Sequence, residues 1–337
     1  MRELKIGMNE AGQRLDKYLK KYLAEAPQGF LFKMIRKKNI TLNGGKCTGA
    51  EKLSEGDVVK LWLSDETIEK FRKEGGTAAG LPDPKKAGLP ERIIYEDGHV
   101  LAYDKPAGML SQKAEPGDVS ANEYLLSWCG GGEEAFTPSV VNRLDRNTTG
   151  LILFGKTLPA LQELSALLKD RDAEKYYLAA VAGHVAKGME IRGYLRKDAR
   201  TNRVAVLEKP SSHEDREIRT ACTPVAYGDG ITLLRVHLIT GRTHQIRAHL
   251  ASVGHPVLGD TKYGEREANR RCQSLTGCRH QLLHAFELTF PETDGVLKPL
   301  SGKTLRAPVP EAFVRLFPEA GDIARGAVHE TTERKRK

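Results

Sequence analysis

The sequence predicts an α+β protein in which a small α/β domain precedes a larger domain built around a mixed or antiparallel sheet. The chain has 337 residues, which is enough for about two domains. From residue 91 to residue 318, short strand patterns outnumber helical ones and favour a large sheet. Positive charge is concentrated at the start, where residues 1–64 hold 13 Lys and Arg but only 7 Asp and Glu. A local basic module of this kind is typical of proteins that bind a polyanion.

The composition excludes several classes of protein. Hydrophobic residues make up 39% of the chain and charged residues 29%, which excludes a wholly disordered, collagenous or membrane-embedded protein. The first residues are charged rather than apolar, so we expect no secretory signal. Five cysteines are too few for a disulfide scaffold, and their odd number favours free thiols. We therefore expect a cytoplasmic protein with no membrane segment.

The first domain is expected at residues 1–64, with two helices and a small hairpin sheet. The first helix pattern places apolar side chains at helical spacing: Leu15, Tyr18, Leu19, Tyr22 and Leu23. A second helix pattern lies at 31–35, and a turn at 43–45 leads to a strand pattern at 58–63. This module resembles the small RNA-binding domain of the S-four ribosomal-protein type.

The resemblance to that domain implies that the helix pair presents a basic face to an RNA backbone, where phosphate contacts position a protein without reading sequence. The basic residues expected on that face are Arg14, Lys17, Lys33, Arg36, Lys37 and Lys38. An ordinary solvated helix face is the alternative interpretation of the same charges.

Two segments are expected to lie outside the folded domains. Residues 65–90 predict a linker, because residues 75–82 are rich in Gly, Ala and Pro. Residues 319–337 predict a disordered basic tail, because the chain ends on four consecutive basic residues.

The larger domain is expected between them, at residues 91–318. Strand patterns occur at 92–95, 100–103, 151–154, 176–181 and 231–238. One helix is predicted at 158–168, and another is predicted to begin near Thr243, whose hydroxyl suits a helix cap.

A charged loop at residues 142–150 directly precedes the apolar strand pattern at 151–154. Asp145 lies between Arg143 and Arg146, and nearby positive charge favours the ionised form of a carboxylate. Gly150 permits a tight entry into the strand. A surface loop of ordinary ion pairs would have the same composition, so the loop alone does not establish a functional site.

A second polar cluster, at residues 238–250, combines a strand end, a turn at Gly241 and the start of a helix. Arginines and histidines at a helix start, here Arg242, His244 and Arg247, suit the binding of an anion. A third motif is the strand pattern at 174–181, where alternation places Tyr176 and Tyr177 on opposite faces. One tyrosine is expected in the core and the other beside a cleft.

Together these three motifs resemble those of the RluA family of pseudouridine synthases, enzymes that isomerise uridine within structured RNA. The resemblance rests on the signature loop at 143–150, the strand motif at 175–179 and the strand–helix motif at 240–250, and flanking segments at 104–108, 255–260 and 283–285 agree with it. It implies an RNA substrate. The basic N-terminal domain resembles the members that act on large-subunit (23S) ribosomal RNA, and transfer RNA is the second candidate.

The resemblance also implies roles for individual residues. Asp145 would be the catalytic carboxylate, Arg247 would pair with it, and Tyr177 would pack against the uracil. Arg143 would fill the space vacated by the flipped nucleotide or hold its phosphate. Further substrate contacts are expected from the other polar residues of the motifs: Thr148, Thr149, Arg242, His244 and Gln245.

The expected reaction suits these residue types. The bond between uracil N1 and ribose C1′ must break, the base must turn, and C5 must bond to C1′. Nothing is oxidised and no phosphate moves, so we expect neither a cofactor nor a metal. The carboxylate could attack C1′ or remove the 2′ proton to give a glycal, and the sequence does not choose between these routes. In either route the base must leave its stack, at a cost of a few kcal/mol.

Other interpretations stay open at this point. Cys272, Cys278, His280 and His284 could be drawn together as a zinc site, but their spacing matches no closed zinc pattern. A serine hydrolase is disfavoured because the chain lacks the G-x-S-x-G motif. A non-catalytic RNA-binding assembly factor could use the same basic module but would not require the Asp145 loop. We expect a monomer in either case.

Overall fold

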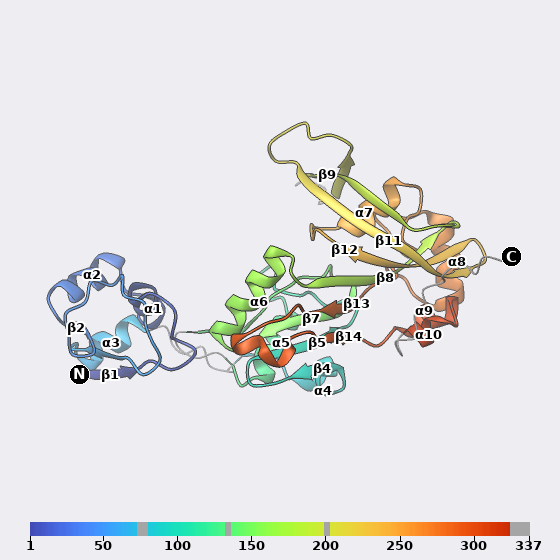
Figure 1. Ribbon diagram of the computed structural model, residues 1–337. Coiled ribbons are helices and arrows are strands. Elements are labelled where there is room, and N and C mark those ends of the chain that lie inside the picture. The colour runs from blue at the N-terminus through green and yellow to red at the C-terminus, as the bar shows by residue number, and fades with distance from the viewer. Residues whose placement is uncertain (73–79, 132–135, 199–202, 324–337) are drawn as a thin grey trace.

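The computed structural model describes residues 1–72, 80–131, 136–198 and 203–323. The chain forms a three-stranded sheet near the N-terminus and an eleven-stranded sheet in the larger domain (Figure 1). The predicted α+β fold with a large, mostly antiparallel sheet is therefore confirmed. No helix among the described residues is long and apolar enough to cross a membrane.

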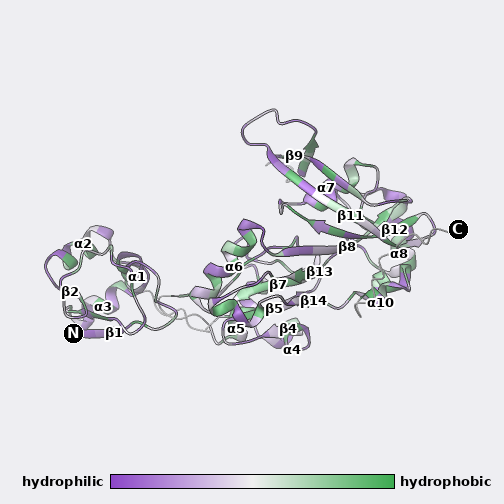
Figure 2. Cartoon of the chain, in the orientation of Figure 1, coloured by the Kyte–Doolittle hydropathy of each residue, from purple (hydrophilic) through white to green (hydrophobic). Residues whose placement is uncertain are grey.

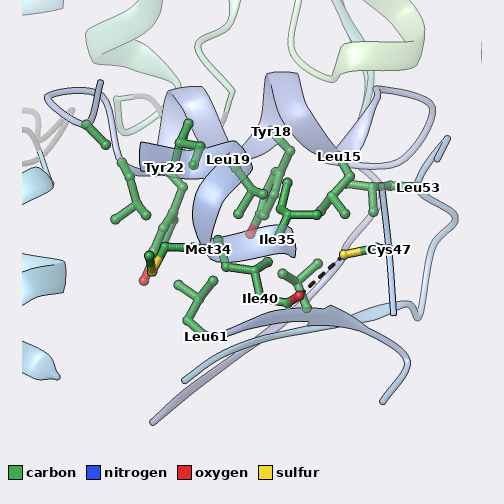
Figure 3. Close-up of a cluster of buried hydrophobic side chains, with 14 of the residues drawn as sticks. Leu15, Tyr18, Leu19, Tyr22, Met34, Ile35, Ile40, Cys47, Leu53 and Leu61 are labelled. Carbon is green, nitrogen blue, oxygen red and sulfur yellow. Dashed lines mark hydrogen bonds between the residues drawn. The ribbon is translucent and has the colours of Figure 1, made fainter. Parts of the chain in front are cut away.

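The N-terminal domain packs two amphipathic helices on one face of its sheet. The helices are α1 (Leu15–Tyr22) and α2 (Gln28–Arg36), and the strands, in sheet order, are β1 (Arg2–Lys5), β3 (Val58–Leu61) and β2 (Ile40–Leu42). Figure 3 shows how Leu15, Leu19 and Ile35 point from the helices toward Ile40 and Leu61 of the sheet. The helical apolar spacing thus predicts the face that this domain buries.

The N-terminal core extends further along the chain than predicted. Helix α3 (Asp65–Phe71) lies inside the expected linker, yet its Ile68 is fully buried in the same core. The Ser64 side chain caps this helix by accepting a hydrogen bond from the Thr67 backbone. Beyond the undescribed residues 73–79, the short helices η1 (Pro84–Ala87) and α4 (Leu89–Arg92) already belong to the larger domain, where Leu89 is buried. The predicted linker at 65–90 was therefore too long.

The large sheet brings together strands from distant parts of the chain, and β7 and β13 form the only parallel pair among the described strands. Its order is β10-β9-β11-β12-β8-β13-β7-β5-β4, with β14 beside β13 and β6 beside β7. In chain order the bounds are β4 (Ile93–Glu96), β5 (Val100–Lys105), β6 (Ser139–Val140), β7 (Thr149–Gly155), β8 (Glu174–Ala182), β9 (Met189–Asp198), β10 (Arg203–Leu207), β11 (Arg216–Gly228), β12 (Ile231–Leu238), β13 (Leu283–Thr289) and β14 (Thr304–Arg306).

Helices cover both faces of this sheet, and its strands β5 and β7 are strongly hydrophobic (Figure 2). One face packs against α6 (Leu158–Asp170), η2 (Gly295–Leu300), α8 (Arg266–Thr276) and α9 (Glu311–Leu316). The other face packs against α5 (Ala121–Trp128) and α7 (Gln245–Ser252). Tyr177 of β8 touches the apolar clusters beneath both α5 and α7, so it lies where the two halves of this second face meet.

Two helix boundaries differ from the prediction. Helix α7 begins at Gln245 rather than near Thr243, and His244, not Thr243, occupies the cap position. At the C-terminus, α10 (Ala320–Ile323) buries Ala320 and Ile323, so the expected disordered tail cannot begin at 319. The rest of that predicted tail, residues 324–337, lies outside the described residues.

Candidate active site

The charged loop that carries Asp145 joins β6 to β7 and is held by contacts from Ser111 and Lys105. The Ser111 hydroxyl donates to the Leu144 carbonyl and accepts from the Leu144 amide, both at 2.9 Å. The Lys105 ammonium donates to the Arg146 carbonyl at 2.9 Å. Main-chain contacts on both sides of Asp145 fix its backbone before any substrate binds, which favours an exact placement of its side chain.

Gly150 explains how this loop can enter the sheet beside β13. Its φ is +106°, a conformation that favours glycine, and a Cβ atom there would overlap the backbone carbonyl of Ala285. The parallel β7–β13 pairing brings Gly150 opposite Ala285 and Thr149 opposite His284. The close approach of two main chains therefore requires glycine at this position.

Asp145 is bound by an arginine from the strand–helix motif at 240–250. Arg247 Nη1 lies 2.8 Å from Asp145 Oδ2, although the two residues are 102 positions apart in the chain. Asp260 holds the other edge of the same guanidinium, with Nε to Oδ2 at 2.6 Å and Nη2 to Oδ1 at 2.9 Å. The Arg247 side chain is only 7% exposed and that of Asp260 is fully buried. A buried bidentate pair of this kind fixes the guanidinium plane and aims its third nitrogen at Asp145.

The charge states of this pair follow from its contacts. Burial works against the charge of Arg247, but the hydrogen bonds and charge of Asp260, with the charge of Asp145, outweigh it and raise the pKa of Arg247. Burial likewise opposes the charge of Asp260, yet its bonds to Arg247 lower the pKa of the carboxyl. Both groups are therefore charged at neutral pH.

Lys105 is a second buried cation beneath the loop. Its side chain is fully buried, and Nζ donates to the carbonyls of Pro106, Met109 and Arg146, each at 2.9 Å. Burial lowers the pKa of Lys105 to about 7, while the charges of Asp145 and Asp104 oppose that shift. Lys105 thus connects the loop to the end of β5, and in its protonated form it adds positive charge near Asp145.

Tyr177 and His244 are two further side chains that lie near the Asp145 carboxylate. Burial, together with the charge of Asp145, raises the pKa of Tyr177 well above its usual value, so the phenol is neutral. His244 Nε2 lies 4.0 Å from Asp145 Oδ2, and its side chain is 9% exposed. The structure thus brings side chains from all three sequence motifs around one carboxylate.

The remaining predicted substrate contacts divide into two groups. Arg143 and Arg242 are exposed near the site. Three other side chains, those of Thr148, Thr149 and Gln245, form hydrogen bonds within the protein. Thr148 accepts from the Gln281 side-chain amide at 3.3 Å, and the Thr149 hydroxyl pairs with His284 Nδ1 at 2.8 Å. Gln245 bonds to the hydroxyls of Thr240 and Thr220, to the carbonyl of 219 and to the amide of 242. The sequence does not reveal that these polar groups hold the loop and the helix start, and their role as substrate contacts stays a prediction.

Several residues of the site were missed by the sequence analysis. Lys105 and Ser111 hold the Asp145 loop, and Asp260 and Tyr263 hold residues of the 240–250 motif. Lys105 and Asp260 fall in the flanking segments at 104–108 and 255–260, but no role was assigned to either. A lysine at the end of an otherwise apolar strand pattern is a further local signal that could have drawn attention to Lys105.

The basic residues predicted on the N-terminal helix pair are all exposed: Arg14, Lys17, Lys33, Arg36, Lys37 and Lys38. Arg14 forms a bidentate pair with Asp16, at 3.1 and 2.8 Å, so part of its charge is neutralised. The other five lie at the start of α1 and along or just after α2, where their side chains are exposed to solvent.

The cysteine-rich segment considered as a zinc site has a different arrangement. Cys278 Sγ lies 3.5 Å from the His280 ring, whereas Cys272 contacts Thr276 and His284 contacts Thr149. Within the part of the chain that the structure describes, no group of three or more His, Cys, Asp or Glu side chains is placed to hold a metal ion.

Comparisons with known proteins identify the larger domain. Residues 99–252 match the RNA pseudouridylate synthase family. The chain is 32% identical over 320 residues to ribosomal large subunit pseudouridine synthase C of Escherichia coli, covering 92% of this chain and 93% of that protein. The chain belongs to the RNA pseudouridylate synthase family. The enzyme of the same name from Haemophilus influenzae is 30% identical over 313 residues, covering 90% of this chain and 89% of that protein.

Solved structures agree on the fold of this pseudouridine synthase. The human RNA pseudouridylate synthase domain containing 4 protein aligns with a TM-score of 0.55 and 19% identity, over 69% of this chain and 96% of that one. The corresponding human domain containing 1 protein gives a TM-score of 0.52 and 21% identity, over 69% of this chain and 86% of that one. Members of the family isomerise uridine in RNA, so the chain is an isomerase and not merely an RNA-binding protein.

Proposed function

We propose that this enzyme converts specific uridines of large-subunit ribosomal RNA to pseudouridine, with Asp145 as its catalytic carboxylate. The observation that carries the assignment of Asp145 is its position between Arg247, Tyr177 and His244, on a loop fixed from both sides. The choice of RNA rests on the relatives named as ribosomal large subunit pseudouridine synthase C, which align over nearly their whole length.

Each neighbour of Asp145 has a distinct task in this proposal. Arg247 holds the carboxylate so that one oxygen faces the ribose, and Tyr177 packs against the uracil once the base has left its stack. Arg143 and Arg242, both exposed, contact the phosphates on either side of the flipped nucleotide. Attack at C1′ and removal of the 2′ proton both need a single carboxylate beside the sugar, and the arrangement serves either route.

The N-terminal domain increases affinity without choosing the target base. Its exposed basic residues, Lys17, Lys33, Arg36, Lys37 and Lys38, contact the RNA backbone. We also propose that the enzyme acts as a monomer in the cytoplasm, which agrees with five cysteines that are all free thiols.

The test is to map pseudouridine by carbodiimide primer extension in ribosomal and transfer RNA from cells that lack the gene. Cells complemented with the wild-type gene should regain specific stops in large-subunit RNA, and cells complemented with Asp145→Ala should not. Asp172→Asn, which changes an exposed carboxylate before β8, is the matched control and should restore the stops.

The outcomes separate the proposal from its alternatives. Stops that return in transfer RNA alone would replace the proposed target and keep the enzyme. Stops that return with Asp145→Ala would remove Asp145 from the chemistry. Purified Asp145→Ala should bind the RNA with an affinity close to that of wild type, because the change leaves the basic surfaces intact.

A further inference from the structure

His244 has a backbone conformation that is unusual for a residue other than glycine. It precedes α7 with φ +53° and ψ +16°, in the left-handed region that glycine adopts most easily. Non-glycine residues in this region carry a conformational cost of about 1 kcal/mol or more, and they concentrate at functional sites. The fold thus keeps an imidazole where the backbone alone would favour glycine.

The other histidine of the same motif serves as a contrast. His249 is fully buried on α7, and its Nδ1 pairs with the Thr220 hydroxyl at 2.9 Å, toward β11 and away from Asp145. His244 instead points its Nε2 toward the Asp145 carboxylate. Of the two imidazoles, His244 is the one that faces the Asp145 carboxylate.

Tyr263 determines which nitrogen of His244 carries the proton. The phenol oxygen of Tyr263 accepts a hydrogen bond from the Val204 backbone amide of β10 at 2.9 Å. The same oxygen lies 3.0 Å from His244 Nδ1, where its hydrogen can be donated to that nitrogen. In a neutral imidazole whose Nδ1 accepts, the proton lies on Nε2, so this arrangement makes Nε2 a donor.

The surroundings keep the ring neutral and fixed in place. Burial lowers the pKa of His244, the charges of Arg247 and Lys262 lower it further, and those of Asp145 and Asp260 oppose them. The His244 and Tyr263 rings meet edge to face with centroids 5.7 Å apart, and the Arg247 guanidinium lies 5.3 Å from the centre of the Tyr263 ring. Tyr263 therefore supports both His244 and Arg247, two of the residues around Asp145.

An N–H donor and a carboxylate oxygen 4.0 Å apart are too distant to bond to each other. Both can reach one hydroxyl oxygen placed between them at about 2.8 Å, because a hydroxyl accepts with its lone pair while it donates its hydrogen. In both proposed routes Asp145 works at C1′ or at the 2′ proton, so the hydroxyl on C2′ is the substrate group nearest to this gap.

We infer that His244 recognises the ribose 2′-hydroxyl of the target nucleotide, donating from Nε2 while that hydroxyl donates to Asp145. This inference rests on the proposed role of Asp145. It makes His244 a specificity-determining residue that distinguishes ribose from deoxyribose, because the 2′-hydroxyl is the group by which a protein tells RNA from DNA. Tyr263 is the positioning residue that fixes the required tautomer.

The test compares two stem-loops built on the mapped target site, one with pseudouridine and one with 2′-deoxypseudouridine at the modified position. Using product RNA avoids turnover during the measurement of Kd. Wild type should bind the deoxy RNA about tenfold more weakly, because that RNA lacks the hydroxyl that bonds to His244 and to the charged Asp145. His244→Asn should reduce this ratio to near one, because asparagine tolerates the left-handed backbone but cannot reach the gap.

Two further variants keep the test decisive. Tyr263→Phe leaves the imidazole in place but frees its tautomer, so the deoxy penalty should fall to an intermediate value, even if His244→Asn does not fold. His213→Asn, at an exposed histidine between β10 and β11, is the control and should keep the wild-type ratio. A full tenfold penalty in both His244→Asn and Tyr263→Phe would overturn the inference.

This experiment is separable from the test of the proposed function. The deoxy penalty is an equilibrium property of product binding and does not depend on turnover. Activity that persists in Asp145→Ala would contradict the catalytic assignment, whereas an unchanged deoxy penalty contradicts only the role of His244.

Discussion

Replacing Asp260 by Asn should damage both the stability and the chemistry of this enzyme. The substitution keeps the size of the side chain but removes the charge that faces two nitrogens of the Arg247 guanidinium, at 2.6 and 2.9 Å. Because the Asp260 carboxylate is fully buried and the Arg247 side chain is 7% exposed, the arginine would remain as an incompletely compensated buried charge. Breaking a buried pair in this way costs about 3–5 kcal/mol.

That cost can be measured as a change in melting temperature. In a domain of this size, each 1 kcal/mol shifts the melting temperature by about 2–4 °C, so the lower figure predicts a loss of roughly 6–12 °C. The released guanidinium can also rotate away from Asp145, and small misplacements of a catalytic group lower kcat by up to roughly 100-fold. RNA affinity should change little, since Asp260 is fully buried.

Glu287→Gln provides the matched control. Glu287 is also buried and pairs with two arginines, Arg235 at 2.7 Å and Arg306 at 2.6 Å, but these lie on the opposite face of the sheet from Tyr177. This variant should lose stability while it keeps kcat in the temperature range where it is folded. The reasoning would be refuted if Asp260→Asn retained the wild-type kcat, or if both variants lost kcat equally.

Three further predictions concern the loop, a buried carboxylate and the basic helices. Gly150→Ala should destabilise the catalytic domain by at least ~3 kcal/mol in urea unfolding, because the added Cβ would overlap the main chain of β13. Gly130→Ala, at a positive φ with open space around it, should cost only about 1 kcal/mol. Similar losses of stability in the two variants would contradict the argument that two main chains approach closely at Gly150. Burial raises the pKa of Asp104 to about 6, so its contribution to stability is full below pH 4 and is lost as the pH rises through 6. The stability of Asp104→Asn relative to wild type should therefore rise by roughly 1–3 kcal/mol between pH 4 and pH 7. A difference in the free energy of urea unfolding that does not change with pH would argue against a buried charge at Asp104. Lys37→Ala should lower the slope of log Kd against log salt concentration by about 0.7–0.9 without changing kcat. Lys169→Ala, at an exposed position on α6, should leave that slope unchanged. Equal effects of the two variants would show that the helix pair is not the RNA-binding surface.

Elements with a regular apolar pattern could be predicted from the sequence. The helical spacing of Leu15, Tyr18, Leu19 and Tyr22 matches the buried face of α1, and the predicted helix at 158–168 is α6. The apolar runs at 151–154 and 176–181 are the centres of β7 and β8. These patterns succeed because each element buries one face whatever its partner is.

Elements with mixed patterns were missed or misplaced. Strand β9 buries only Gly193 and Leu195 and ends in three exposed charged residues, so its apolar alternation is short and weak. Helix α3 begins with two acidic residues and buries only Ile68, and it was therefore included in the linker. In both cases the stabilising contacts come from neighbours distant in sequence, which a local pattern does not contain.

For the candidate site, the sequence by itself determined the three motifs and, through their resemblance to a known family, Asp145, Tyr177 and Arg247 as its members. Only the tertiary structure decided the direction of each side chain: it turned Thr148, Thr149 and Gln245 inward. It also brought Lys105 and Asp260 beneath the loop and placed Tyr263 against His244. The physical reason is that a polar side chain can bond equally well to substrate or to the protein's own backbone. The outcome depends on which donors and acceptors the fold brings within about 3 Å of it.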